Sequence, residues 1–286
     1  MNRVTKHFFL LLLLSGGCVQ TIAIRTVGGI LDYGWEVFNE ESDLQLAKES
    51  IGSNLKLVEA LLKGDPGNEK LLLLACQGYS SYSLAFVEDD SVERARDFYR
   101  RGRDFGLQIL DENEKFRASR GRDLDSFERS LEELSDDDVP AIFWTAFGWG
   151  SYINVHRSDP DALADLPRVN AMMNFVAKRN PGYYYGGALA YLGMFAASTP
   201  PMMGGNPERG RKYFEESISR TNGTFLMTYV YFAQSYAMQT LNQALFDSLL
   251  TIVDERPLEI LPEARLPNAV AKRKAGLLRT RGADFF

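Results

Sequence analysis

The chain has 286 residues, of which 45% are hydrophobic and 24% are charged, and its formal net charge at pH 7 is −6. Such a composition is typical of a globular protein that buries a sizeable core, and the acidic balance argues against a nucleic-acid-binding surface. Beyond the N-terminal signal described next, the chain has one histidine, His156, and two cysteines, Cys18 and Cys76, which excludes a zinc site with four such ligands.

The first eighteen residues resemble a bacterial lipoprotein signal. A positively charged start precedes a seven-residue apolar run, Phe8 to Leu14, which is too short to span a bilayer, and small residues then lead to Cys18. In this class of signal the cysteine becomes the first mature residue and carries lipid. We therefore predict a signal peptide over residues 1–17, lipidation of Cys18, and a periplasmic protein anchored in the bacterial outer membrane. Secretion without a lipid is the alternative, because Ser15 occupies the position where such signals usually have leucine.

Residues 18–42 are apolar with interleaved glycines, and we expect a tether with a short N-terminal helix and a loop there. Residues 43–286 are predicted to form a single helical domain. Apolar residues recur every three or four positions from Asp43 to Leu62, which is typical of an amphipathic helix, whereas Leu71–Phe86 is apolar on all sides and predicts a buried helix. Further helices are expected at Val92–Leu110, within Glu112–Asp138, and at Ala141–Val155, Arg168–Arg179, Tyr183–Ser198, Glu208–Ser219, Thr224–Thr240, Ala244–Val253 and Asn268–Arg279.

Turn and cap residues separate these helices. Asp90 and Glu93 have the spacing of a capping box before the third helix, and Asn206-Pro207 is a strong helix start. Asp136-Asp137-Asp138 lacks the glycine and the distal glutamate of a calcium loop, so we interpret it as negative charge at a helix N-terminus. No alternation of apolar and polar residues longer than four residues occurs, and the fold class is therefore predicted to be all-α.

The alternation of buried and amphipathic helices predicts an α-solenoid-like array of helix pairs, and degenerate repeats of tetratricopeptide (TPR) type support this arrangement. Bulky and small residues recur at the spacing of such repeats in three pairs of helices. The positions are Leu74, Gln77, Gly78 and Ser81 with Ala95, Tyr99 and Gly102; Trp144, Phe147, Gly148 and Ser151 with Val169, Met173, Val176 and Pro181; and Leu189, Leu192, Gly193 and Ala196 with Gly210, Phe214 and Ser217. A generic helical bundle is the alternative.

Aromatic, glycine and proline residues are concentrated between Trp144 and Asn206, and we place the candidate site there. We expect its aromatic side chains to line an apolar cleft or pore, and its apolar loop, Pro200–Gly205, to cover that cleft or to form a subunit interface. The candidate ligand-binding or interface residues are Trp144, Trp149, Tyr183, Tyr184, Tyr185, Pro200, Pro201, Met202 and Met203. For Trp144 and Tyr185, a role in the core of the repeats is the alternative.

Four segments resemble the T-component lipoproteins of TRAP transporters, a family often called TatT. They are Gly78-Tyr79 with Phe86-Val87-Glu88-Asp89, Asp138–Trp144, Tyr183–Ala188 and Pro200–Gly205, of which the last two are the most specific. The resemblance implies a periplasmic, lipid-anchored, all-helical protein with cryptic TPR-like repeats. It also implies a homotrimer, association with the solute-binding P component of a TRAP system, and a ligand that is hydrophobic or a carboxylate.

The leading hypothesis is a non-catalytic binding protein that receives or passes a small ligand together with the P component of a TRAP-type transport system. A TPR-like scaffold that binds only protein partners is the alternative. An enzyme is not expected, because the neighbouring acids Glu88, Asp89 and Asp90 are better explained as helix-capping residues than as an oriented catalytic pair. No cofactor, metal site or nucleic-acid partner is expected.

Overall fold

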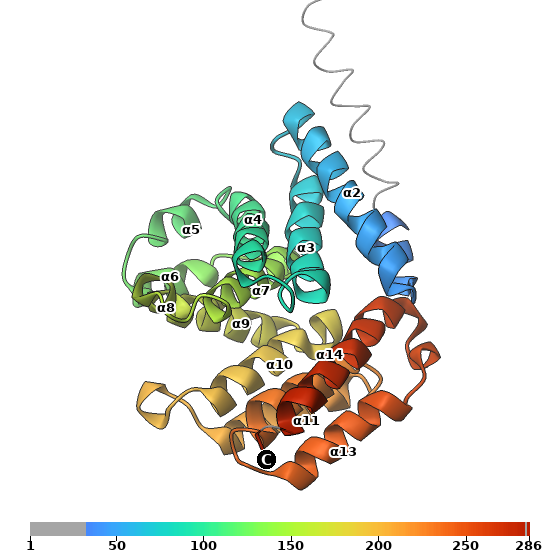
Figure 1. Cartoon of the computed structure of the whole chain (residues 1–286). Helices are drawn as coiled ribbons and strands as arrows, with labels where there is room; N and C mark the ends of the chain where they lie inside the picture. The colour runs from blue at the N-terminus through green and yellow to red at the C-terminus, as the bar shows by residue number, and fades with distance from the viewer. Residues whose placement is uncertain (1–32, 284) are drawn as a thin grey trace, which may run out of the picture.

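The computed structural model describes residues 33–283 and 285–286, and these residues form helices and connecting turns with no β-strand among them (Figure 1). The predicted all-α class is thereby confirmed. The predicted signal peptide, Cys18 and residues 18–32 of the predicted tether lie outside the described residues. Within the described part of the chain, no helix combines the length and the apolar character needed to cross a membrane.

The helices follow one another with short connections. A short N-terminal helix covers residues 33–40. It is followed by α2 (Leu44–Gly64), α3 (Glu69–Phe86), α4 (Val92–Leu110), α5 (Glu114–Ser119), α6 (Leu124–Leu131), α7 (Val139–Asn154), α8 (Pro160–Ala164), α9 (Leu166–Arg179), α10 (Tyr183–Ser198), α11 (Pro207–Arg220), α12 (Met227–Phe232), α13 (Gln243–Glu255) and α14 (Arg265–Ala283). Short helical turns are η1 (Asp136–Asp138), η2 (Pro201–Met203), η3 (Ala233–Ala237), η4 (Leu258–Ile260) and η5 (Pro262–Ala264).

Polar side chains determine where several of these helices begin. The predicted cap at Asp90 is wrong by one residue, because the Ser91 hydroxyl accepts the backbone N–H of Arg94 at the start of α4. The acidic run before α7 does lie at a helix start, where Asp138 forms a capping box with Ser135. Each such cap stabilises its helix by about 0.5–2 kcal/mol. Side chains that cap other helices are Asp43, Asn68, Asn206 and Asn242.

The helices that the repeat pattern pairs do pack together, namely α3 against α4, α7 against α9 and α10 against α11. Small residues set the distance between the helices of a pair. A Cβ atom at Gly210 of α11 would lie 2.9 Å from both the Gly193 carbonyl oxygen and the Ala197 nitrogen of α10. A larger residue at position 210 would therefore force these two helices apart. That the pairs stack as a TPR-type superhelix remains a prediction.

Several boundaries differ from the sequence-based expectation. The polar stretch 112–138 holds two short helices, α5 and α6, rather than one. The buried helix expected at Thr224–Thr240 begins at Met227 and continues as a π-helical turn, in which the Met238 N–H reaches the Ala233 carbonyl oxygen at 3.1 Å. Pro267 lies inside the first turn of α14, where the N–H that a proline lacks would have no helical partner anyway.

Two clusters of buried apolar side chains make up the core. One gathers residues mainly from α3 to α9. The other joins residues of α2, α3 and α4 to the helices from α11 to α14. Phe147 of α7 and Tyr184 of α10 contact both clusters, and these residues therefore mark the junction between the two halves of the protein.

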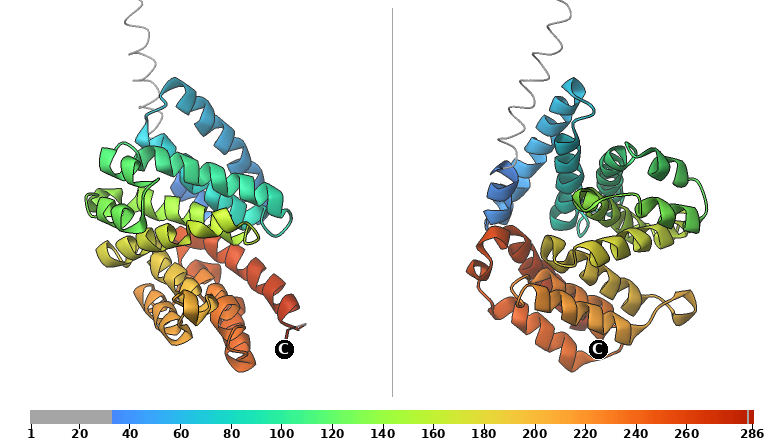
Figure 2. Two further views of the ribbon diagram at one scale, coloured as in Figure 1. Left: turned by 90° about the vertical axis from the view of Figure 1, so that its left-hand side faces the viewer. Right: turned by 180° about the vertical axis from the view of Figure 1, so that it is seen from behind.

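The last helix, α14, returns to the beginning of the fold and meets the start of α2 (Figures 1 and 2). Near its start, Arg265 Nε donates to the carbonyl oxygen of Glu40 at 2.6 Å. In its middle, the Lys274 ammonium lies 2.6 Å from Glu88 Oε1 and 2.9 Å from Asp89 Oδ2. Only 8% of Lys274 is exposed, so this ion cluster is largely removed from water. It attaches α14 to the turn between α3 and α4.

Replacement of Lys274 by methionine leaves two largely buried carboxylates without their ammonium partner, although Arg273 still lies 3.1 Å from Asp89. Removing one partner of a buried ion pair costs about 3–5 kcal/mol. We therefore expect the free energy of unfolding, measured by urea denaturation, to fall by about 3 kcal/mol in K274M. The control is R220M, because the exposed pair between Arg220 and Glu216 should contribute less than about 1 kcal/mol. Equal losses in the two variants would show that the ion cluster does not hold α14.

Candidate functional site

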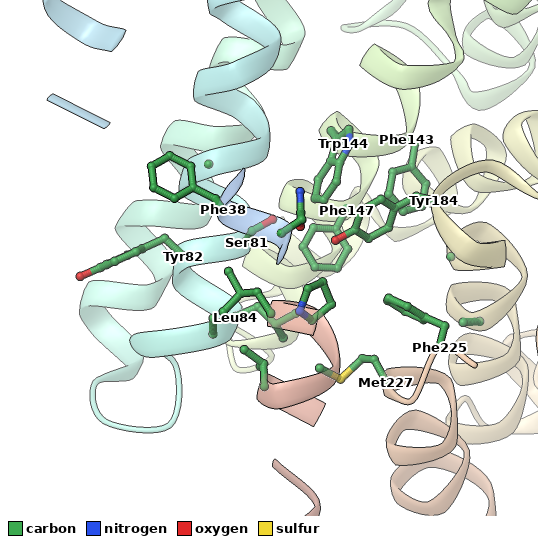
Figure 3. A pocket seen from close by; sticks show the side chains of 18 of the residues that line it. Phe38, Ser81, Tyr82, Leu84, Phe143, Trp144, Phe147, Tyr184, Phe225 and Met227 are labelled. Carbon is green, nitrogen blue, oxygen red and sulfur yellow. The ribbon is translucent and has the colours of Figure 1, made fainter. Parts of the chain in front are cut away.

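A cavity of about 90 Å³ lies where the two core clusters meet (Figure 3). Its wall is built by the N-terminal helix, α2, α3, α7, α10, α12 and α14, together with the segment just before α12. No charged side chain of the described chain lines it. Much of the wall is aromatic, and the aromatic lining residues are Trp35, Phe38, Tyr82, Phe86, Phe143, Trp144, Phe147, Tyr184, Tyr191, Phe225 and Tyr231.

Trp144 of α7 lies at the centre of the aromatic wall and is 1% exposed. Its ring centroid is 4.5 Å from that of Tyr184, 5.6 Å from that of Phe147 and 5.9 Å from that of Trp35, and each pair meets edge to face. Aromatic pairs in this geometry add about 0.5–1.5 kcal/mol beyond the burial of their surface. Through Trp35, the N-terminal helix is thus part of the enclosure.

The backbone at the start of α10 has an unusual conformation. Tyr184, Tyr185 and Gly186 have φ angles of 41°, 58° and 73°, so three consecutive residues lie in the left-handed region. Glycine adopts this conformation without penalty, but each tyrosine loses roughly 1–3 kcal/mol. Backbone strain of this kind persists only where the surroundings enforce it, and it is frequent at functional sites.

Contacts on both sides hold this left-handed turn in place. The Ser217 hydroxyl of α11 donates to the Gly186 carbonyl oxygen at 3.0 Å, and the Tyr185 ring stacks on Phe225 with centroids 4.6 Å apart. A Cβ atom at Gly187 would lie 2.7 Å from the Phe143 ring, so glycine is needed for α10 to approach α7 here. The turn and the close approach together place the Tyr184 ring inside the cavity wall.

The polar groups of the wall are uncharged near neutral pH. Burial raises the pKa of the phenols of Tyr184 and Tyr191, and burial followed by the negative charge of Glu88 raises the pKa of Tyr231. An ion that entered the cavity would lose its hydration without meeting a counter-charge, which is costly. The cavity is therefore suited to apolar groups, with a few hydroxyls available to orient them.

The structure brings only some of the predicted site residues together. Trp144 and Tyr184 line the cavity. Tyr183 and Tyr185 pack immediately beside it, and the Tyr183 ring meets Phe143 edge to face at 5.3 Å. Burial raises the pKa of Tyr183 to about 12. All four therefore belong to one aromatic layer, although two of them do not reach the cavity.

Trp149 lies elsewhere. It is buried in the core cluster around α7, with the Arg103 guanidinium 5.8 Å from its ring centroid, and it does not line the cavity. Trp149 follows Trp144 by five residues, which is about one and a half helical turns, and its side chain therefore leaves α7 from a different face. Trp149 is thus close to Trp144 in the sequence but is not part of the cavity wall.

The loop Pro200–Gly205 also lies away from the cavity, and its turn η2 projects from the body of the protein (Figures 1 and 2). Met202 is 91% exposed. The loop closes tightly on itself, because a Cβ atom at Gly205 would lie 1.6 Å from the Thr199 carbonyl oxygen. None of its described side chains lines the cavity, and its expected role in a subunit interface stays a prediction.

Sequence reasoning missed the part of the wall that comes from distant segments, above all Trp35, Phe38, Tyr82, Phe225 and Tyr231. The spacing of Trp35 and Phe38 by three residues indicates a shared helix face. This spacing predicts that the two side chains lie on one helix face, but it does not predict which distant helices that face contacts.

A sequence model of the family described as TRAP transporter T-component matches residues 40–286 of the chain. A protein of Treponema pallidum (strain Nichols), described as an uncharacterized protein, is 26% identical over 273 aligned residues, which cover 87% of this chain and 82% of that protein. The family match confirms the resemblance seen in the sequence and spans nearly the whole cavity wall. T-components are periplasmic-side accessory components of TRAP transport systems. The chain therefore belongs to the TRAP transporter T-component family.

Proposed function

We propose that the protein holds a small apolar molecule in the aromatic cavity and exchanges it with the solute-binding P component of a TRAP transporter. The observation that carries this proposal is the enclosed aromatic space itself, with residues from seven helices converging on it. Membership of the T-component family supports the transport context. Lipidation of Cys18, anchoring in the outer membrane and assembly as a homotrimer complete the proposal, and the resemblance noted in the sequence supports them.

The desolvation of ligand and wall favours an apolar ligand. A site for one water needs roughly 10–15 Å³ and an apolar cavity of about 150 Å³ holds a benzene molecule, so about 90 Å³ leaves space for a short hydrocarbon chain. Each Å² of apolar ligand surface that is buried contributes about 25 cal/mol. The uncharged wall offers no such gain to an ion, which would instead lose its hydration.

The chemistry of the wall supports binding rather than catalysis. Its titratable groups are phenols, and burial holds the pKa values of Tyr184, Tyr191 and Tyr231 above the usual value. Such groups are poor general bases near neutral pH. Their hydroxyls are better suited to fixing the orientation of a bound molecule.

The projecting loop favours a role in protein contacts. Met202 lies at the tip of the turn and, at 91% exposed, is the most exposed of the large apolar side chains in the described part of the chain. We propose that it contacts a second copy of the chain or the P component. A TPR-like scaffold that binds only proteins is the alternative function, and it would use this loop without the cavity.

Filling the cavity should remove ligand binding. Ser81 of α3 lines the cavity, and its hydroxyl makes no hydrogen bond within the described residues (Figure 3). In S81F, we expect the affinity for the neutral apolar probe hexanol, measured by isothermal titration calorimetry, to fall at least about tenfold, because the new ring occupies the probe's space. The control is S219F, which adds the same ring at an exposed position of α11. Unchanged probe binding by a folded S81F protein would show that the cavity is not the site.

A charge on the projecting loop should weaken assembly. In M202D, an apolar contact is replaced by a carboxylate that the interface would have to bury without a partner. We expect self-association, measured by sedimentation velocity, and binding to the purified P component to weaken at least about a hundredfold, with an unchanged melting temperature. L241D is the matched control, since Leu241 is 70% exposed on a different loop. If assembly and P-component binding both survive in M202D, the loop is not an interface.

A further inference from the structure

We infer that the ligand is a single-chain amphiphile with an acidic head group, whose chain enters the aromatic cavity and whose head is bound in a basic groove outside it. This inference rests on the proposed function, because it assigns the class of molecule that the cavity takes. It adds a second site, the basic groove, to the one already described.

The basic groove is an open depression of about 910 Å³ between α2, the end of α3, the start of α4 and α14. Tyr82 and Phe86 of α3 line both the basic groove and the aromatic cavity. The two spaces therefore share a wall, and that wall is made of two aromatic side chains rather than of backbone. Their ring centroids are 5.4 Å apart.

Tyr82 spans this shared wall. Its hydroxyl lies against Gly52 of α2, where a Cβ atom would come within 3.2 Å of it, and Gly52 itself lines the groove. Figure 3 shows the same hydroxyl directed away from the cluster formed by Trp144, Phe147 and Tyr184. The ring thus faces the cavity while its polar end faces the groove. A change of its side-chain rotamer would connect the two spaces without any movement of a helix.

The charge in the groove is strongly one-sided. Four basic side chains line it, Lys48, Lys56, Arg94 and Arg273, whereas Glu49 is the one acidic side chain in the described lining. Because the cavity wall carries no charge, a ligand that uses both spaces needs an apolar chain and an anionic end. A cationic head would be repelled by this groove.

Several of these basic groups keep hydrogen-bonding capacity for a ligand. Within the described chain, Arg94 has no carboxylate within 4.0 Å and lies over the Phe98 ring at 5.1 Å instead. Arg273 donates to Asp89 through one terminal nitrogen, but its buried Nε has no partner among the described residues. The Lys48 ammonium lies 3.9 Å from one exposed carboxylate, that of Asp90. The remaining cation, Lys56, forms an ion pair with Glu59 of the same helix. An acidic head group would supply the missing acceptors.

Isothermal titration calorimetry of the purified full-length protein with three C6 amphiphiles tests the inference, because a short chain matches the size of the cavity. The probes are hexanoate, hexanol and hexyltrimethylammonium, which share a chain and differ in head-group charge. We expect hexanoate to bind at least about tenfold more tightly than hexanol, and the cationic probe to bind most weakly, since a charge-assisted hydrogen bond exceeds a neutral one.

The variant K48Q/R94Q removes two groove cations and should bind hexanoate at least about tenfold more weakly while its affinity for hexanol stays unchanged. The control K63Q/R100Q removes the same charge from exposed positions of α2 and α4 that do not line the groove, and should keep the preference of the natural protein. Equal binding of hexanoate and hexanol by the natural protein, or an unaltered preference in K48Q/R94Q, would overturn the role of the groove while leaving the cavity intact. Binding of none of the three probes would overturn the cavity function as well.

Discussion

The attachment of α14 to the turn after α3 is the contact on which the rest of the structure depends. Lys274 lies between Glu88 and Asp89 with most of its surface buried, and the desolvation of these charges is offset only because they are paired. The contact brings together segments 186 residues apart and closes the helical array on its own beginning. Side chains from the first turns of α14 then complete the cavity wall, and the neighbouring Arg273 reaches the basic groove. One buried ion cluster therefore positions both parts of the proposed ligand site.

The left-handed turn at the start of α10 shows how packing overrides local backbone preference. Two tyrosines in this conformation cost roughly 1–3 kcal/mol each, which is compensated by stacking on Phe225 and by burial against Trp144. A regular helix through the same residues would point the Tyr184 ring elsewhere, because a change in φ redirects the side chain. The strain is thus linked to the shape of the cavity. It also explains why glycine occupies positions 186 and 187, where one residue needs a positive φ and the next permits close contact with Phe143.

The elements of this fold could largely be predicted from the sequence, whereas its candidate site could not. Apolar periodicity and caps such as Asn206 gave helices close to their observed bounds, since these signals are local. Trp144 and Tyr184 were placed in one aromatic site and their rings do meet in the cavity wall, yet Trp149 was grouped with them only through nearness in sequence. Trp35 and the groove residues depend on how the chain closes, which no local pattern encodes. The left-handed turn was hidden as well, because Tyr-Tyr-Gly has no turn signature at its first two positions.

Native mass spectrometry of the mature protein, purified without detergent, tests the proposed ligand-binding role most directly. A small molecule held in the aromatic cavity should remain bound through purification and appear as a defined mass above that of the protein, and organic extraction should remove it. Fragmentation of the released species should then identify an apolar chain with an acidic head. Protein of unmodified mass in several independent preparations, with no uptake of added amphiphile, would contradict the ligand-binding role and leave the protein-binding scaffold as the better description.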